Sequence, residues 1–304
     1  MSARELDAAG IRDPALRASY DACRRLNAQH GRTYYLATLL LPPWKRPYVH
    51  ALYGFARYAD EIVDDLASTL TDAQKADWLI GWGDQFLADV RAGGSRHEIS
   101  RAVVDTVRRW DIPVRHVEDF LASMRMDLTV TEYATYADLM TYVHGSAAVI
   151  GLQMVPLLEP LVPREVAEPY AADLGIAFQL SNFVRDVGED LLRGRIYLPM
   201  EDLAVFGVTR EHLEHGVVDG PVRRLLAFEV ARTREVYRSA WQGVRLLHPT
   251  SRPCIETALA LYGGILDEVE RADYQVLTQR VSVGPLTRAR VALPGLARAV
   301  AARR

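Results

Sequence analysis

The sequence predicts an all-α protein, because three features agree on helices. Apolar residues recur at three- and four-residue spacing over long stretches. Alternating β-branched stretches bounded by tight turns are scarce. Clusters of proline and glycine fall between the periodic stretches, where helices should end. We therefore expect roughly ten helices packed as one bundle. The periodic stretches are Pro47–Asp65, Ala73–Arg91, Tyr170–Leu192, Pro221–Leu247 and Cys254–Arg280.

The breaks between these stretches are short. They lie at Leu41 to Pro43, Ala92 to Ser95, Pro156 to Pro163 and Val283 to Pro285. None is long enough to link two domains. We expect a single domain over residues 1–304, with a core from about residue 20 to 280 and an arginine-rich C-terminal tail over residues 281–304.

The tail is the most unevenly charged part of the chain. Residues 280–304 contain six arginines and no aspartate or glutamate. A frayed, solvated terminus is the expected form. The alternative is contact with an anionic membrane surface.

The bulk composition excludes several classes of protein. A formal net charge of −3 gives no general reason to expect a nucleic-acid partner. The two cysteines, Cys23 and Cys254, form no CxxC motif, which argues against a disulfide scaffold or a thiolate metal site. No signal peptide and no run of about 18 apolar residues is present. We expect a cytoplasmic protein, with peripheral contact at the inner face of the membrane as a further option.

A first polar stripe lies on the stretch Pro47–Asp65. Asp60 and Asp64 are four residues apart, so on a helix their carboxylates share a face. Tyr53 and Arg57 fall on the same face, and all four lie within an arc of about 60°. Two like charges at this spacing destabilise an isolated helix slightly. A bound cation would offset that cost, although a solvated acidic face is the simpler interpretation of this pair alone.

A second stripe repeats the design. Asn182, Asp186 and Asp190 are spaced by four residues, and Gln179 precedes them by three, so these groups span roughly 80° of one helix. The residues between them are largely apolar, which predicts a buried helix with one wet face. Carboxylate and amide oxygens without cysteine or clustered histidine favour a hard cation such as Mg²⁺, with Mn²⁺ as the alternative ion. Two such faces across a bundle cavity would hold Mg²⁺ on a diphosphate group.

These residues also carry a resemblance to a known family. The order Leu174-Gly175, Gln179, Asn182-Phe-Val-Arg185-Asp186, Asp190 and Arg195 to Pro199 resembles the longer signature of the squalene/phytoene synthase family, and Tyr142 to Gly151 is similar to its second signature. His30 to Tyr34, Tyr53 to Asp65 and Tyr262 to Arg280 resemble its N-terminal part and its last core helix. The likeness covers most of the chain.

The resemblance implies an all-α isoprenoid synthase fold, a single helical bundle around a central cavity. It also implies roles for individual residues. Asp60, Asp64, Asn182, Asp186 and Asp190 would hold Mg²⁺ and, with it, the diphosphates. Tyr142 would lie near the reacting carbons, and Tyr34, Tyr35, Tyr58 and Phe178 could offer π faces to cations. The residues implied to contact diphosphate oxygens or to orient the metal ligands are His30, Arg32, Thr33, Tyr53, Arg57, Gln179, Arg185, Tyr262 and Arg280.

The implied reaction is a prenyl transfer. Two geranylgeranyl diphosphates would condense head to head through a cyclopropylcarbinyl diphosphate to phytoene, a step of carotenoid biosynthesis. No GxGxxG fingerprint occurs, which argues against NADPH and a hydride step. The N-terminal block resembles that of bacterial members that make phytoene.

Other activities stay open at this point. Squalene, dehydrosqualene or presqualene diphosphate could be made from farnesyl diphosphate. A class I terpene cyclase would use one prenyl diphosphate, and the Arg185-Asp186 block and the Tyr197–Pro199 ending argue against it. An inactive scaffold homologue would be expected to have lost the carboxylates of the two stripes.

Overall fold

A computed structural model describes the backbone of residues 3–64 and 70–303, with the side chains of residues 61–64 and 72 outside the described part. Within those ranges no β-strand occurs, and the β-type pairing consists of isolated bridges, one of which joins Glu132 to Ile196. The predicted all-α class is confirmed. The helices are α1 (Ala3–Ala8), α2 (Pro14–His30), α3 (Arg32–Thr38), α4 (Arg46–Asp64), α5 (Asp72–Ala92), α6 (Glu98–Arg109), α7 (Arg115–Met126), α8 (Tyr136–Val143), α9 (Val149–Leu158), α10 (Arg164–Leu192), α11 (Met200–Phe206), α12 (Arg210–Glu214), α13 (Gly220–Gly243), α14 (Arg252–Arg271) and α15 (Pro285–Ala301).

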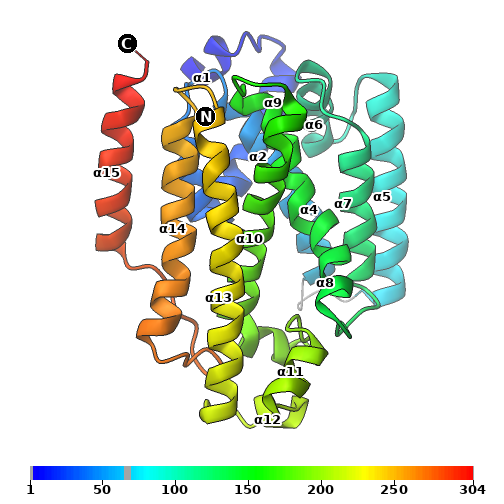
Figure 1. Cartoon of the computed structure of the whole chain (residues 1–304). Coiled ribbons are helices and arrows are strands. Elements are labelled where there is room, and N and C mark those ends of the chain that lie inside the picture. The colour runs from blue at the N-terminus through cyan, green and yellow to red at the C-terminus, as the bar shows by residue number, and fades with distance from the viewer. Residues whose placement is uncertain (1–2, 65–69, 304) are drawn as a thin grey trace.

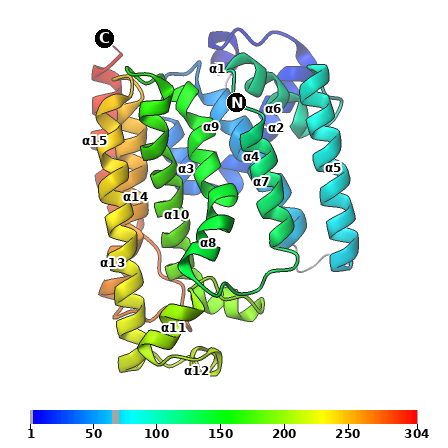
Figure 2. The ribbon, with the colours of Figure 1, turned by 45° about the vertical axis from the view of Figure 1, so that its right-hand side comes forward.

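The long helices stand side by side around α10 (Figure 1). This helix packs against α9, α13 and α14. On the other side of the molecule α2, α4 and α6 pack together, and α5 stands at that edge. The short helices α11 and α12 close one end of the bundle. Figure 2 shows α8 and α9 as successive segments of one rod beside α10.

Local sequence explains where the helices begin and end. Thr71 caps α5 through a capping box with Gln74, and Gly93 ends that helix in the left-handed region at φ 80°. Asp219 accepts from the amide of Val222 at the start of α13. Four of the five predicted helical stretches end within a few residues of the observed helices.

The fifth stretch, Cys254–Arg280, is wrong in its last third, residues 272–280. Helix α14 ends at Arg271, because Asp273 and Tyr274 adopt left-handed backbone angles, with φ of 50° and 61°. The chain then runs without helix until Pro285. Arg280 therefore belongs to a connecting segment, which carries its guanidinium across to α10.

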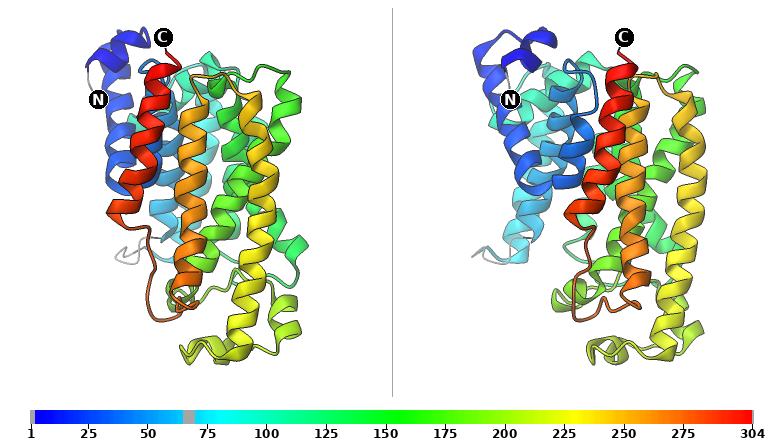
Figure 3. Two further views of the ribbon diagram at one scale, coloured as in Figure 1. Left: turned by 60° about the vertical axis from the view of Figure 1, so that its left-hand side comes forward. Right: turned by 90° about the vertical axis from the view of Figure 1, so that its left-hand side faces the viewer.

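The expectation of a frayed tail is also wrong. Residues 285–301 form α15, which packs along α14 on the outside of the bundle (Figure 3). Ala299 is fully buried, and Arg298 forms an ion pair with Glu256 of α14 at 3.1 Å. Arg303 donates hydrogen bonds to the carbonyls of Leu40 and Leu41. These contacts order the C-terminal segment.

One helical stretch has the length and composition of a membrane span. Among the residues that the structure describes, the one such stretch is Tyr136–Leu158, and 61% of its most apolar 18-residue window is buried inside the bundle. Since the core helices of soluble proteins have the same character, the stretch is weak support for a span. Its packing against α10 accounts for its apolar composition.

Glycines allow α10 to approach its neighbours closely. A Cβ atom on Gly175 would lie 2.2 Å from the carbonyl oxygen of Ala147, and one on Gly151 would lie 2.0 Å from that of Ala171. Between α8 and α9 the rod widens into a π-helical turn, His144–Ala148. The turn lies directly against α10, so this contact sets the distance between the helices that carry Tyr142 and the second stripe.

We expect Gly175→Ala to lower the free energy of unfolding by about 1–3 kcal/mol, because the added methyl group overlaps backbone that cannot yield easily. Gly263 of α14 is the matched control, since a Cβ there meets nothing within 4 Å. Gly263→Ala should be neutral or stabilising by about 0.5–1 kcal/mol. Urea unfolding of both variants tests the pair, and equal stabilities would contradict the close-approach argument.

Candidate active site

A cavity of about 680 Å³ lies at the centre of the bundle. Its wall is formed by α3, α4, α10 and α14, by the segment between α14 and α15, and by residues near Asp127 and Tyr197. Tyr142 and every residue predicted to bind metal or diphosphate line it, except Asp64, whose side chain lies outside the described residues. The predicted residues in the wall are His30, Arg32, Thr33, Tyr34, Tyr53, Arg57, Asp60, Tyr142, Gln179, Asn182, Arg185, Asp186, Asp190, Tyr262 and Arg280.

The first stripe presents an ion pair to the cavity. Arg57 donates from Nη1 to Oδ2 of Asp60 at 2.7 Å within α4. Both side chains are partly exposed, with 30% and 42% of their surface accessible. Such a pair stabilises the fold weakly. The arginine can turn to an incoming phosphate, and the carboxylate can turn to a cation, without a large loss of stability.

The second stripe is held by a denser cluster. Arg185 binds Asp186 through two hydrogen bonds, of 2.7 Å from Nε and 2.5 Å from Nη2. Arg280 approaches the same carboxylate from the segment after α14, with Nε 2.9 Å from Oδ1, and its Nη1 lies 3.6 Å from Glu189. Burial acts to lower the pKa of Arg185, but hydrogen bonding to Asp186 and the charge of Asp186 raise it overall. Arg185 therefore stays charged, and both arginines line the cavity.

An aromatic wall stands beside the polar stripes. Tyr34 packs against Tyr53, Phe178 and Tyr262, with ring centroids 4.9–5.9 Å apart. Phe178 stacks on Tyr262 at 4.2 Å, and Tyr237 donates to or accepts from Ser181 behind them. Burial raises the pKa of both Tyr34 and Tyr262. These phenols are therefore neutral, and both line the cavity, whereas Phe178 packs against them without lining it.

The floor of the cavity is a carboxylate bound by two tyrosines. Tyr142 donates to Oδ2 of Asp127 at 2.9 Å, and Tyr197 donates to Oδ1 at 3.2 Å. Arg195 donates to the backbone carbonyl of Asp127 at 2.8 Å. Burial, followed by the charge of Asp127, raises the pKa of Tyr142 well above its usual range. Tyr142 therefore lies at the floor of the cavity, where Asp127 fixes the position of its hydroxyl group.

Sequence reasoning missed several residues of the wall. Arg195 and Tyr197 belong to the longer family signature, but no binding or catalytic role was predicted for either residue. Asp127 has no spacing relation to either stripe, so no sequence signal marks it. Arg288 lies in the expected tail, and its Nε is buried with no hydrogen-bond partner. It is a cationic donor available to an anion in the cavity.

Two of the aromatic candidates lie elsewhere. Tyr35 stacks on His50, with ring centroids 5.5 Å apart. Tyr58 packs against Trp78 and Trp82, and its hydroxyl is 3.2 Å from Nε2 of His97. Neither lines the cavity. Both belong to the core around α4, so they are not candidates for contact with a cationic intermediate at this site.

The donor set suits Mg²⁺ by its chemistry. The acidic and amide side chains in the wall are Asp60, Asn182, Asp186, Glu189 and Asp190, and Asp190 is buried. All offer oxygen, which is the ligand that Mg²⁺ prefers. Among the side chains that the structure describes, no three of Asp, Glu, His or Cys converge as a preformed metal cluster. The residues fit an ion that completes its coordination with water and phosphate oxygens.

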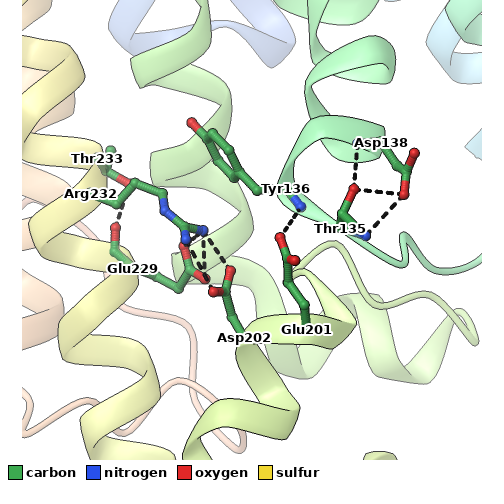
Figure 4. A network of polar contacts seen from close by, with 8 residues as sticks. All are labelled: Thr135, Tyr136, Asp138, Glu201, Asp202, Glu229, Arg232 and Thr233. Carbon is green, nitrogen blue, oxygen red and sulfur yellow. Dashed lines mark hydrogen bonds and ion pairs between the residues drawn. The ribbon is translucent and has the colours of Figure 1, made fainter.

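A buried ionic network supports the floor from below (Figure 4). Arg232 of α13 binds Asp202 of α11 through both terminal nitrogens, at 2.6 and 3.1 Å, and approaches Glu229 at 3.2 Å. Its guanidinium lies over the ring of Tyr136, at 4.2 Å from the centroid. Glu201 accepts from the backbone amide of Tyr136 at 2.7 Å. The network thereby joins α8, α11 and α13.

Backbone hydrogen bonds connect this network to the floor. The amides of Ile196, Met200 and Glu201 donate to the carbonyls of residues 131, 133 and 134. Tyr197, which binds Asp127, lies within this pairing. The Arg232 network therefore fixes the segment that carries Arg195 and Tyr197.

Comparison with known proteins places the chain among isoprenoid enzymes. The squalene/phytoene synthase family model matches residues 27–287. The chain is 38% identical to a phytoene synthase of Arthrospira platensis, over 90% of this chain and 91% of that one. It is 38% identical to a 15-cis-phytoene synthase of Synechocystis, over 87% and 80% of the two chains.

Solved structures show the same fold. A dehydrosqualene synthase superposes with a TM-score of 0.84 at 24% identity, covering 93% of this chain and 96% of the other. A squalene synthase from Alicyclobacillus acidocaldarius superposes with a TM-score of 0.78 at 25% identity, covering 88% and 98%. The isoprenoid synthase fold predicted from the resemblance is confirmed.

We expect the network in Figure 4 to make stability depend on pH. Burial raises the pKa of Glu229 to about 8, above its value in an unfolded chain. The folded protein then binds more protons than the unfolded chain between about pH 4.5 and 8, so this contribution to stability is lost as pH rises through that window. Glu229→Gln should flatten the corresponding part of a plot of Tm against pH. Parallel plots for the two proteins would contradict the assignment.

Proposed function

The chain belongs to the squalene/phytoene synthase family and is thus a prenyl-transferring enzyme, and we propose that it condenses two geranylgeranyl diphosphates head to head to phytoene with release of diphosphate. The observation that carries the proposal is the cavity itself, in which two stripes of paired arginine and carboxylate groups lie beside a wall of neutral aromatic rings. The C20 substrate is supported by the names of the phytoene synthases that match most of the chain.

The polar stripes would act on the diphosphates. In the first half-reaction the C–O bond of one substrate breaks, and the double bond of the second attacks the allylic cation. Loss of a proton then closes a cyclopropane ring. Arg57, Arg185, Arg280 and Arg288 are placed to bind the phosphate oxygens as negative charge develops on the leaving group.

Mg²⁺ is part of the proposal as the ion that neutralises the diphosphates. Asp60, Asp64, Asn182, Asp186 and Asp190 would hold it, with Mn²⁺ as the alternative. Asp60 and Asp186 line the cavity, and each forms an ion pair with an arginine there. The arginines would turn to phosphate when the carboxylates bind the ion.

The aromatic wall would serve the second half-reaction. The cyclopropyl intermediate loses its diphosphate, and the resulting cation rearranges and loses a proton to form the central triene of phytoene. Tyr34 and Tyr262 would face the cationic carbons with their π surfaces and keep water from them, and Phe178 would support both rings from its packing position against them. Tyr142, whose hydroxyl is held by Asp127 at the floor, would lie near the reacting carbons.

The lipid character of substrate and product suggests where the enzyme works. We propose a cytoplasmic enzyme with peripheral contact at the inner face of the membrane. A second candidate activity, formation of squalene or dehydrosqualene from farnesyl diphosphate, is favoured by the solved structures that share the fold. The absence of a GxGxxG sequence counts against a hydride-dependent product.

The decisive measurement is the product. The purified chain should convert geranylgeranyl diphosphate to phytoene with Mg²⁺ and without NADPH, and chelation of the metal should abolish turnover. Farnesyl diphosphate should be the poorer substrate by kcat/KM. A C30 hydrocarbon as the main product would instead favour the second candidate, and a cyclic product from one substrate would overturn both.

Removal of one carboxylate from either stripe should stop the reaction. We expect Asp60→Asn and Asp186→Asn to lower kcat by roughly 100-fold or more, since each removes charge from the site that neutralises the leaving group. Both variants should stay folded by circular dichroism. Glu165→Gln, an exposed position at the start of α10, is the matched control and should keep wild-type turnover. Full activity of both stripe variants would sink the proposal.

A further inference from the structure

A second cavity, of about 560 Å³, lies between α2, α6 and the loop that joins α5 to α6. Figure 2 shows α6 beside α2, on the side of the bundle where α5 stands. Among the residues that the structure describes, this cavity and the central one share no lining residue. Its volume is within the range of small-molecule sites, about 300–1,000 Å³. We term it the α6 cavity, and the proposed prenyl transfer uses none of its residues.

Three arginines of α6 line the α6 cavity, namely Arg101, Arg108 and Arg109. At about 100° per residue, they fall within an arc of about 100° on one side of the helix. Within the described part of the chain, no carboxylate forms an ion pair with any of the three. The guanidinium of Arg109 lies instead over the neutral ring of Tyr48, 5.4 Å from its centroid. A solvated helix face would explain such a cluster by itself, so the positions of the other two guanidinium groups decide what it can do.

Backbone carbonyls of the loop before α6 hold these two groups in place. Arg108 donates from Nη1 to the carbonyl of Gly93 at 2.8 Å, and Arg101 donates from Nε to the carbonyl of Ser95 at 2.9 Å. A carbonyl does not neutralise the charge, and each guanidinium has five N–H donors. Both cations are therefore positioned in advance, and each keeps donors that an anion can use.

Gly93 makes the position of Arg108 possible. Its backbone is left-handed, with φ of 80°, and a Cβ atom there would overlap Nη1 of Arg108. A side chain at this position would therefore displace the guanidinium. The neighbouring Gly94 also lines the α6 cavity, but a Cβ on it meets nothing within 4 Å.

The rest of the α6 cavity offers acceptors and an apolar patch. Oδ2 of Asp105 accepts from the hydroxyl of Tyr20 at 2.6 Å, and Oδ1 of Asp13 accepts from the amide of Leu16 at 2.7 Å. The side chains of Leu16 and the buried Val104 line the cavity between the charged groups. The two carboxylates are outnumbered by the three arginines, so the cavity as a whole favours an anion. The second oxygen of each carboxylate can accept a hydrogen bond from a hydroxyl group.

We propose that the α6 cavity binds a small organic phosphate, with its phosphate oxygens on the arginines of α6 and a hydroxyl group on Asp105. A phosphate group has three terminal oxygens and a charge of about −1.5 to −2 near neutral pH, which suits several guanidinium groups better than a single carboxylate does. The apolar patch of Leu16 and Val104 would pack against the carbon skeleton. This inference does not rest on the proposed function, because the two cavities are separate.

Titration calorimetry of the full chain without Mg²⁺ tests the site, with ribose 5-phosphate as the probe and ribose as its neutral counterpart. We expect one ribose 5-phosphate per chain, bound at least about tenfold more tightly than ribose. Arg108→Gln should weaken binding of the phosphate at least about tenfold, because it removes a charge and the forked donors. Equal affinity for the two sugars, or no binding of ribose 5-phosphate at millimolar concentration, would overturn the inference.

Two control variants separate this site from general charge and from the central cavity. Arg91→Gln, in the last turn of α5, removes the same charge from an exposed side chain outside the α6 cavity. Arg185→Gln removes an arginine of the central cavity. Both should bind ribose 5-phosphate as the wild type does. A loss in the Arg91 variant equal to that in the Arg108 variant would indicate unspecific attraction, and a loss in the Arg185 variant would place the ligand in the central cavity. Either result would overturn the inference.

A pair of glycine variants tests the geometry without changing any charge. Gly93→Ala should weaken binding of ribose 5-phosphate at least about tenfold, because the added methyl group displaces Arg108. Gly94→Ala is the matched control and should bind as the wild type does, since its Cβ enters open space. Circular dichroism should show both variants folded. Wild-type affinity in the Gly93 variant would contradict the role given to Arg108, and Arg108→Gln tests the same role should Gly93→Ala fail to fold.

Discussion

The structure depends on one constraint, which is that α10 must be buried on most sides and still carry charge. Ala177, Leu180 and Val184 pack into the bundle, while Arg185 and Asp186 keep only 15% of their side-chain surface exposed. An unpaired charge at such depth would be costly, but the bidentate pair and the approach of Arg280 satisfy it. The pair in turn needs open space on that side of the helix, and this space is the cavity. Fold and site are thus two results of the same arrangement.

The close contacts around α10 explain why the site is held in place. Gly151 and Gly175 let the rod of α8 and α9 approach until backbone meets backbone. That approach places Tyr142 opposite Asp127, and the Arg232 network fixes the partner segment that holds Tyr197. These contacts are made by backbone and by buried ions, so they fix the helices relative to one another. The ion pair of Arg57 with Asp60 is more exposed, with 30% and 42% of the side-chain surface accessible.

Sequence reasoning recovered the long helices and the two polar stripes because both depend on local spacing, and the family resemblance supplied the other predicted residues of the cavity wall. Asn182, Asp186 and Asp190 share one face of α10 at intervals of four residues, and Arg57 and Asp60 share one face of α4, so each grouping can be read without coordinates. Asp127 could not be found this way, since its role comes from hydrogen bonds that it accepts from Tyr142, 15 positions later, and Tyr197, 70 positions later. Arg280 was identified but placed on a helix, because the left-handed angles of Asp273 and Tyr274 leave no periodic signal.

The C-terminal segment shows how the same composition can have two physical meanings. Its arginines suggested a solvated end, yet three of them serve structure or site: Arg298 binds Glu256, Arg303 caps carbonyls, and Arg288 lines the cavity. The composition alone does not give the order in which small and large apolar residues follow each other along the helix. Gly295 and Ala299 allow close packing on one side, which forces Leu286 and Leu293 to the other. The packing that orders the helix is therefore also what turns its large apolar side chains toward the solvent.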